Sequence, residues 1–161
     1  AEWFNHQYLQ KQSNEELLES FKNLEETKNI NLSDEKLLKI IGLMKERATF
    51  VKDIYTQGKF FFEAPAEYDE KAVKKAWNEE TASIMTELSE KLNTTEFKSE
   101  ILKEEIHHLV EEKGLGFGKV MMPLRLALVG ELKGPDVPDL LEILGKEESL
   151  TRLKLAIEKI K

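Results

Sequence analysis

Several residue types and patterns are missing from this chain of 161 residues. It contains no cysteine, which excludes a disulfide framework, a thiolate metal site and a cysteine nucleophile. No run of about 18 apolar residues occurs, so the sequence predicts no membrane-spanning helix. No signal or transit peptide is visible. The first residue is Ala1 rather than Met, so we expect a piece of a longer protein. These absences favour a domain from a reducing compartment, and we expect the cytoplasm.

The sequence also lacks the alternation that is typical of strands. Apolar residues recur at helical spacing along nearly the whole chain, and no fixed-period repeat is evident. We therefore predict an all-α fold made of two packed helical subdomains, residues 1–62 and residues 63–161. The helix-breaking segment Ala64-Pro65-Ala66 is the best candidate for the linker between them.

Local signals set the expected helix bounds. Ser13-x-x-Glu16 is a capping box and predicts a helix from there to about Thr27. Ser33 begins a second helix, and Gly114 is expected to end a later one in the left-handed conformation. Apolar positions along the second helix include Met44, Ala48 and Val51. Further helices are expected over 69–77, over 84–92 with an end at 93–95, and over 101–110.

The last third of the chain predicts two more helices. One covers about Gly116–Leu128, although Pro123 removes a backbone hydrogen bond within it and is expected to kink it. The other ends the chain. The expected apolar faces are Phe117, Met121, Leu124 and Leu128 on the first, and Leu150, Leu153, Ile157 and Ile160 on the last.

Arginine is scarce among the charged residues of this chain. The formal net charge is −7, which argues against bulk electrostatic binding of nucleic acid but leaves room for a local basic face. Only Arg47, Arg125 and Arg152 among the 24 basic residues are arginine. Arginine suits planar, bidentate recognition and stacking. A recognition role and a chance surface position are both open for each of them.

Arg47 interrupts an apolar pattern. It falls where an apolar residue would fit, so its charge requires a partner or a position at the protein surface. The alternative is that the helix ends near Glu46 and that Arg47 points into water. The flanking apolar positions are Ile40, Leu43, Phe50 and Ile54.

Catalytic and metal-binding patterns are weak. Glu104-Glu105-Ile106-His107-His108 contains two overlapping Glu-x-x-His pairs, but a di-iron bundle needs another such pair on a second helix. The segment 114–119 is rich in glycine, yet it lacks the spacing and the hydroxyl residue of a phosphate-binding loop. No nucleophilic triad is apparent. We predict no catalytic residue and no metal site.

The C-terminal third carries a distinctive series of motifs. Met122–Gly130 reads Met-Pro-Leu-Arg-Leu-Ala-Leu-Val-Gly, Leu132–Val137 reads Leu-Lys-Gly-Pro-Asp-Val, and Ile143–Glu147 reads Ile-Leu-Gly-Lys-Glu. In this order they resemble the anticodon-binding end of bacterial glutamyl-tRNA synthetases, which are class I aminoacyl-tRNA synthetases. Trp3–Leu9 and Leu43–Arg47 also resemble segments of that family, so the likeness covers nearly the whole chain.

The resemblance implies that two helical subdomains cage the anticodon. Arg47 would read the third anticodon base, which is C in glutamate tRNA and G in glutamine tRNA. Arg125 would stack on or contact the splayed anticodon bases. The turn Gly134-Pro135-Asp136-Val137, with Lys133 before it, would contact the first anticodon base through nearby backbone groups.

The resemblance also implies partners and cofactors. The partner would be glutamate tRNA, not DNA or a membrane, and the chain would be monomeric. The ATP-binding motifs of the family are absent, so this piece alone would have no ligase activity and no cofactor, whereas the parent would use ATP and Mg²⁺. Charging of glutamine tRNA by the parent is an open alternative. The rival interpretations are a helical protein–protein interaction module and a metal-dependent bundle enzyme.

Overall fold

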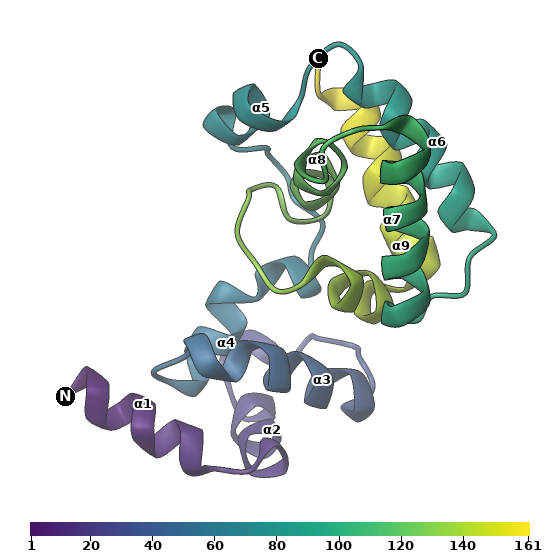
Figure 1. Ribbon diagram of the computed structural model, residues 1–161. Coiled ribbons are helices and arrows are strands. Elements are labelled where there is room, and N and C mark those ends of the chain that lie inside the picture. Colours follow the sequence, from purple (N-terminus) through teal and green to yellow (C-terminus); the bar gives the residue numbers. More distant parts are fainter. The chain divides into compact units, whose positions relative to one another are not determined.

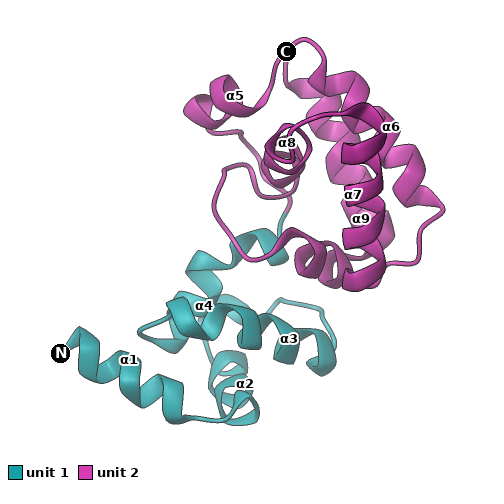
Figure 2. Ribbon diagram, in the orientation of Figure 1, with its two compact units in different colours: residues 1–63 teal, residues 64–161 magenta.

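The chain folds entirely into helices. The computed structural model describes residues 1–161 and contains nine α-helices and no strand (Figure 1). The predicted all-α fold class is therefore confirmed. The molecule divides into two compact units, residues 1–63 and residues 64–161, and each buries a core of its own (Figure 2).

The first unit consists of four α-helices and three 3₁₀ turns. α2 packs against α3 and α4, and the buried side chains between them form the core of this unit. These core residues are Leu17, Phe21, Ile40, Ile41, Met44 and Ile54. The elements are α1 (Glu2–Lys11), α2 (Asn14–Lys22), η1 (Glu25–Thr27), α3 (Asp34–Met44), η2 (Lys45–Arg47), α4 (Val51–Gln57) and η3 (Lys59–Phe61).

The predicted capping box at the start of α2 is confirmed. The Ser13 hydroxyl accepts a hydrogen bond from the Glu16 backbone N–H, and the Ser13 backbone N–H donates to the Glu16 carboxylate. The predicted end at Thr27 is wrong, because α2 ends at Lys22. The Thr27 hydroxyl donates to the Phe21 carbonyl, so a local side-chain bond competes with helix continuation.

Helical spacing of apolar residues extends beyond the true end of α3. This helix stops at Met44, η2 follows, and Ala48 is extended before α4 begins. Ala48 is nevertheless fully buried, so the spacing reflects burial across a turn and not one continuous helix. Of the two alternatives for Arg47, the end of the helix close to Glu46 is confirmed.

The second unit is a bundle of five helices. α9 packs against α6, α7 and α8, while α5 packs against α8 (Figure 1). The core side chains include Met85, Leu88, Leu102, Ile106, Leu124, Leu128, Leu141 and Leu153. The elements are α5 (Glu70–Ala76), α6 (Thr81–Asn93), α7 (Ser99–Lys113), α8 (Gly118–Val129) and α9 (Val137–Lys159).

Helix bounds in the second unit follow the caps. The Asp69 carboxylate accepts from the Ala72 backbone N–H and begins α5. Gly114 ends α7 in the left-handed conformation with φ 61°, as predicted. α8 begins only at Gly118, so the placement of Phe117 on its apolar face is wrong, and that side chain is exposed. Pro123 lies inside α8 and is buried.

The last helix differs from its prediction in two ways. Gly145 interrupts α9 with non-helical angles, φ 83° and ψ 167°, which a glycine tolerates. Leu153 and Ile160 are buried as expected, but Leu150 and Ile157 are only partly buried. The residues buried in their place are Ser149, Arg152 and Ala156.

Candidate nucleic-acid interface

Arg47 lies at the end of η2, on a turn that α1 holds in place. The Gln10 side-chain amide donates to the Lys45 carbonyl over 2.7 Å. The His6 Nδ1 lies 2.7 Å from the Ala48 carbonyl oxygen. Because a carbonyl can only accept, Nδ1 carries the proton in this contact. The backbone on both sides of Arg47 is thus fixed, while its side chain is exposed.

The other side of the same turn is fixed from α4. The Asp53 carboxylate accepts from the backbone N–H groups of Thr49 and Phe50, each over 2.9 Å. Phe50 is 54% exposed, although its spacing placed it on an apolar ridge with Ile54. The available signal was Asp53, which suits the third position of a helix that begins just after Phe50. The turn therefore presents an exposed guanidinium and an exposed aromatic ring.

Arg125 and the turn at Pro135 are brought together in the second unit. The Arg125 Nη1 group, from α8, donates to the Pro135 carbonyl over 2.7 Å. Arg125 is half-buried, so this bond lies at the edge of the core. Two parts of the site predicted from sequence are therefore in direct contact. Arg47 belongs to the first unit.

The predicted residues of the α8–α9 connection differ in what they expose. Lys133 and Asp136 are exposed, whereas Pro135 and Val137 are buried. Val137 is fully buried, so its side chain holds the turn and contacts no ligand in this conformation. Gly134 has φ 136°, a backbone conformation that favours glycine. Any contact at this turn has to use backbone groups or the exposed side chains.

The same connection is anchored where α8 ends. Gly130 adopts φ 87°, and its carbonyl accepts from the Asp69 backbone N–H over 2.8 Å. A Cβ at Gly130 would meet the Glu67 carbonyl oxygen and the Pro65 Cβ, both at 2.8 Å. Only a glycine fits there, so the start of the connection packs directly on the segment that precedes α5.

Arg152 was not assigned to the site by sequence reasoning. It is only 2% exposed, and its Nη1 group donates to the Leu128 carbonyl over 2.8 Å. Its Nε group donates to the Glu148 carboxylate over 2.7 Å. The chance surface position considered for this arginine is therefore wrong. A scarcity of arginine was the only signal in the sequence, and it did not indicate a carbonyl as the partner.

Carboxylates surround the start of α9. Burial raises the pKa of Asp139, and the nearby charges of Asp136 and Glu142 raise it further, while a hydrogen bond from Ser99 opposes the shift. An acidic neighbourhood repels phosphate. Lys133 is the one cationic residue in the 130–136 segment. Apart from Lys133, the chemistry of this turn thus favours contact with a base over contact with the nucleic-acid backbone.

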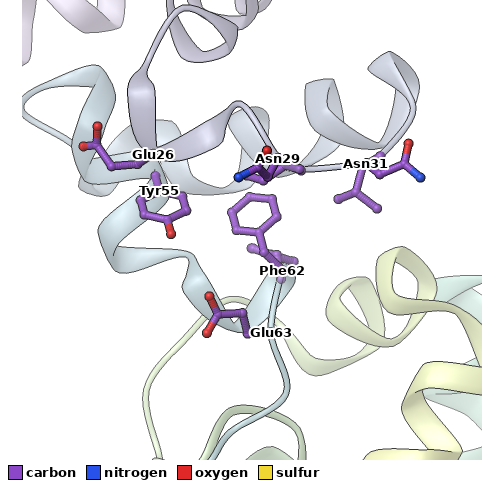
Figure 3. A pocket seen from close by; sticks show the side chains of 9 residues that line it. Glu26, Asn29, Asn31, Tyr55, Phe62 and Glu63 are labelled. Atoms are coloured by element: carbon purple, nitrogen blue, oxygen red, sulfur yellow. The ribbon is translucent and has the colours of Figure 1, made fainter.

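The first unit contains a pocket of about 400 Å³ (Figure 3). Tyr55 and Phe62 stack with their ring centroids 5.9 Å apart on one wall. Asn29, Asn31, Glu26 and Glu63 supply the polar groups. A hydrogen bond from Lys52 lowers the pKa of Glu26. None of the site residues predicted from sequence lines this pocket.

The remaining candidate motifs lie on the surface of the second unit. His107 and His108 are exposed on α7, and the His107 ring stacks on Phe117 with 5.1 Å between centroids. No group of three or more histidine or acidic side chains is placed to hold a metal ion. No helix is both long enough and apolar enough to cross a membrane.

The fold and these anchored turns first define a class: an all-helical domain with an exposed arginine on one anchored turn and an anchored loop between two helices. The family model described as the anticodon binding domain matches residues 7–157, and the chain belongs to that family. This family resemblance was predicted from the sequence motifs and is confirmed.

Individual relatives agree on the kind of protein. The crystal structure of a glutamate tRNA ligase from Elizabethkingia meningosepticum, in complex with its amino acid, is 66% identical with a TM-score of 0.96. The match covers 99% of this chain and 32% of the ligase chain. A glutamate-tRNA synthetase from Elizabethkingia anophelis is 64% identical with a TM-score of 0.89, over 98% and 31% of the two chains.

A curated relative gives the same proportion. The glutamate–tRNA ligase of Christiangramia forsetii is 44% identical over 162 aligned positions, which cover all of this chain and 32% of the relative. The chain thus spans about a third of the length of the ligases it matches. It corresponds to their anticodon-binding part.

Proposed function

We propose that this chain binds the anticodon loop of glutamate tRNA. The observation that carries the proposal is the match of the anticodon binding domain family to residues 7–157, found in relatives that are glutamate–tRNA ligases. Both subdomains predicted from the sequence, residues 1–62 and residues 63–161, take part. Loop bases that are splayed out are read by stacking and by hydrogen bonds to their edges, which suits a surface of arginines and backbone groups.

Arg47 reads the third anticodon base. Cytosine offers the acceptors N3 and O2 to a guanidinium, whereas guanine presents N–H donors that repel it. The anchored turn supports this role, because a reader must be held in place before it can discriminate. By analogy with duplex readout, one good bidentate contact is worth about 1–3 kcal/mol of discrimination.

The second unit contacts the first two bases. The Arg125 guanidinium donates in its plane to the Pro135 carbonyl, and a base can stack on its face. The first base is contacted by backbone groups of Gly134, Pro135 and Asp136. The buried Val137 side chain anchors the turn. Lys133 is exposed and is available to a phosphate of the loop.

The relatives suggest the rest of the parent activity. In our proposal the parent ligates glutamate to tRNA with ATP and Mg²⁺, in the part of its length that lies outside this chain. The parent acts as a monomer in the cytoplasm, and DNA is not a partner. Selection of the glutamate tRNA over the glutamine tRNA rests on Arg47.

Titration with two anticodon stem-loops tests this function. The RNAs differ only in the third anticodon base, C or G, and binding is followed by fluorescence anisotropy at low salt. We expect the C form to bind roughly 5- to 150-fold more tightly, and Arg47→Gln to remove most of that preference.

Lys39→Gln serves as the matched control. Lys39 is an exposed cation on α3 in the same unit, so this variant loses the same charge away from the turn. It should keep the preference for C. Failure of the wild-type chain to bind either RNA would overturn the proposal and favour a protein–protein module. Equal binding of both RNAs would remove Arg47 as the reader.

A further inference from the structure

Arg152 is an unusual residue to find in a helical core. Charged side chains are almost never fully buried unless they are paired, yet Arg152 is 2% exposed. Its carboxylate partner Glu148 is itself 44% exposed. A salt bridge to a residue at the surface does not require burial of the guanidinium. The second bond, to the Leu128 carbonyl, gives the reason for its position.

The Leu128 carbonyl lies at the end of α8. The last four carbonyls of a helix have no donor within that helix. Gly130 follows in the left-handed conformation and turns the chain away, so a donor must come from elsewhere. Arg152, reaching from α9, supplies it. An apolar residue of similar size would fill the space but leave this buried carbonyl without its bond.

The connection between α8 and α9 is therefore held at both ends by arginines. Arg152 donates to the Leu128 carbonyl where the connection begins, and Arg125 donates to the Pro135 carbonyl where it ends. Glu131 and Lys133 lie between these two bonds and are exposed. The exposed part of the connection thus lies between two charge-assisted hydrogen bonds, one at each end.

We propose that Arg152 is a positioning residue for the reading of the first anticodon base. This inference rests on the proposed function. The first base of a glutamate anticodon is a pyrimidine, whereas the aspartate anticodon has guanine there. Backbone groups reject the larger purine only if they cannot move aside. Arg152 keeps the turn rigid enough to do so, without touching the RNA.

The test uses the 161-residue chain and two stem-loops that differ in the first anticodon base, U or G. For the wild-type chain we expect the U form to bind about tenfold more tightly. For Arg152→Met we expect that ratio to fall below about threefold. The ratio for C over G at the third base should not change, because the turn of Arg47 belongs to the other unit.

Leu102→Ala controls for a loss of stability alone. Leu102 is fully buried on α7, so its truncation to alanine leaves a cavity in the same core. A variant that is merely less stable weakens binding of every RNA by the same factor and leaves the ratios unchanged. Leu102→Ala should behave in that way, and Arg152→Met should not.

Arg152→Lys covers the case in which Arg152→Met does not fold, as judged by circular dichroism. Lysine keeps the charge but lacks the planar fork that reaches both Leu128 and Glu148, so we expect the first-base ratio to fall, but by less than in Arg152→Met. A first-base ratio that stays at the wild-type value in every folded Arg152 variant would overturn the inference. A wild-type chain that ignores the first base would instead count against the proposed function.

Discussion

At the scale of single residues, the three arginines have three different environments. Arg47 is exposed on a turn, Arg125 is half-buried, and Arg152 is buried. Both arginines of the second unit donate to backbone carbonyls of one connection. Their rarity in the sequence left a recognition role and a chance surface position both open for each of them. It could not indicate a carbonyl as the partner, because a carbonyl belongs to every residue and leaves no mark in the sequence.

Asp139→Asn is expected to stabilise the chain at neutral pH. Burial raises the pKa of Asp139, and Asp136 and Glu142 raise it further. A carboxyl with a raised pKa contributes most to stability below its unfolded value of about 3.9, and that contribution is lost as the pH rises through its folded value. At pH 7 the ionised Asp139 carboxylate therefore destabilises the folded chain. Replacing it with the amide should raise the free energy of unfolding by less than about 1 kcal/mol after solvent screening.

Thermal unfolding at two pH values checks this prediction. The variant should have the higher Tm at pH 7, and the difference should shrink towards pH 4. Glu147→Gln, at an exposed position of the same helix, should show no such pattern. A Tm difference that grows as the pH falls would contradict the sign of the shift.

At the scale of elements, caps were predicted better than helix lengths. Ser13 and Gly114 occur where the structure has a cap, because a cap is a local event of a few residues. The end of α3 was not predictable in the same way, because no local cap marks it. Ala48 is buried without being helical, and burial alone produces helical spacing across a turn. The break at Gly145 was not predicted either, although a glycine tolerates its angles.

The candidate site was predictable only in part. The resemblance assigned the α8–α9 connection and Arg125 to the site, and the structure places Arg125 in contact with Pro135. Whether these residues and Arg47 contact the anticodon stays a prediction. Phe50 was missed because it lies on a turn that the apolar pattern conceals, and Arg152 was missed because its partner is a backbone carbonyl.

Gly130→Ala is expected to lower the free energy of unfolding by about 2–4 kcal/mol. A side chain at φ 87° is strained, and its Cβ would lie 2.8 Å from both the Glu67 carbonyl oxygen and the Pro65 Cβ. Urea denaturation measures the change.

Gly116→Ala is the matched control for this substitution. A Cβ at Gly116 meets nothing within 4 Å, and its φ is not positive. We expect a small change there, of about 0.5 kcal/mol in either direction. Equal effects of the two substitutions would mean that the connection is not anchored at Gly130.

At the scale of the whole molecule, the acidic net charge is compatible with the kind of contact that the proposed function needs. The chain carries a formal net charge of −7, and carboxylates surround the start of α9. Bulk attraction to phosphate is therefore weak. A module that selects a few splayed bases needs a few fixed donors, and an acidic remainder reduces binding to other nucleic acids.

The proposed function requires the chain to select RNA by its anticodon and not by charge. The most direct measurement is a titration with a glutamate anticodon stem-loop, and with the same stem carrying a scrambled loop, over a series of salt concentrations. In the proposed site only Lys133 is assigned to a phosphate, so we expect a slope of log K against log salt of about −0.7 for the anticodon loop. The preference for that loop should persist at every salt concentration. Equal binding of the two loops, or a much steeper slope that is the same for both, would contradict the account.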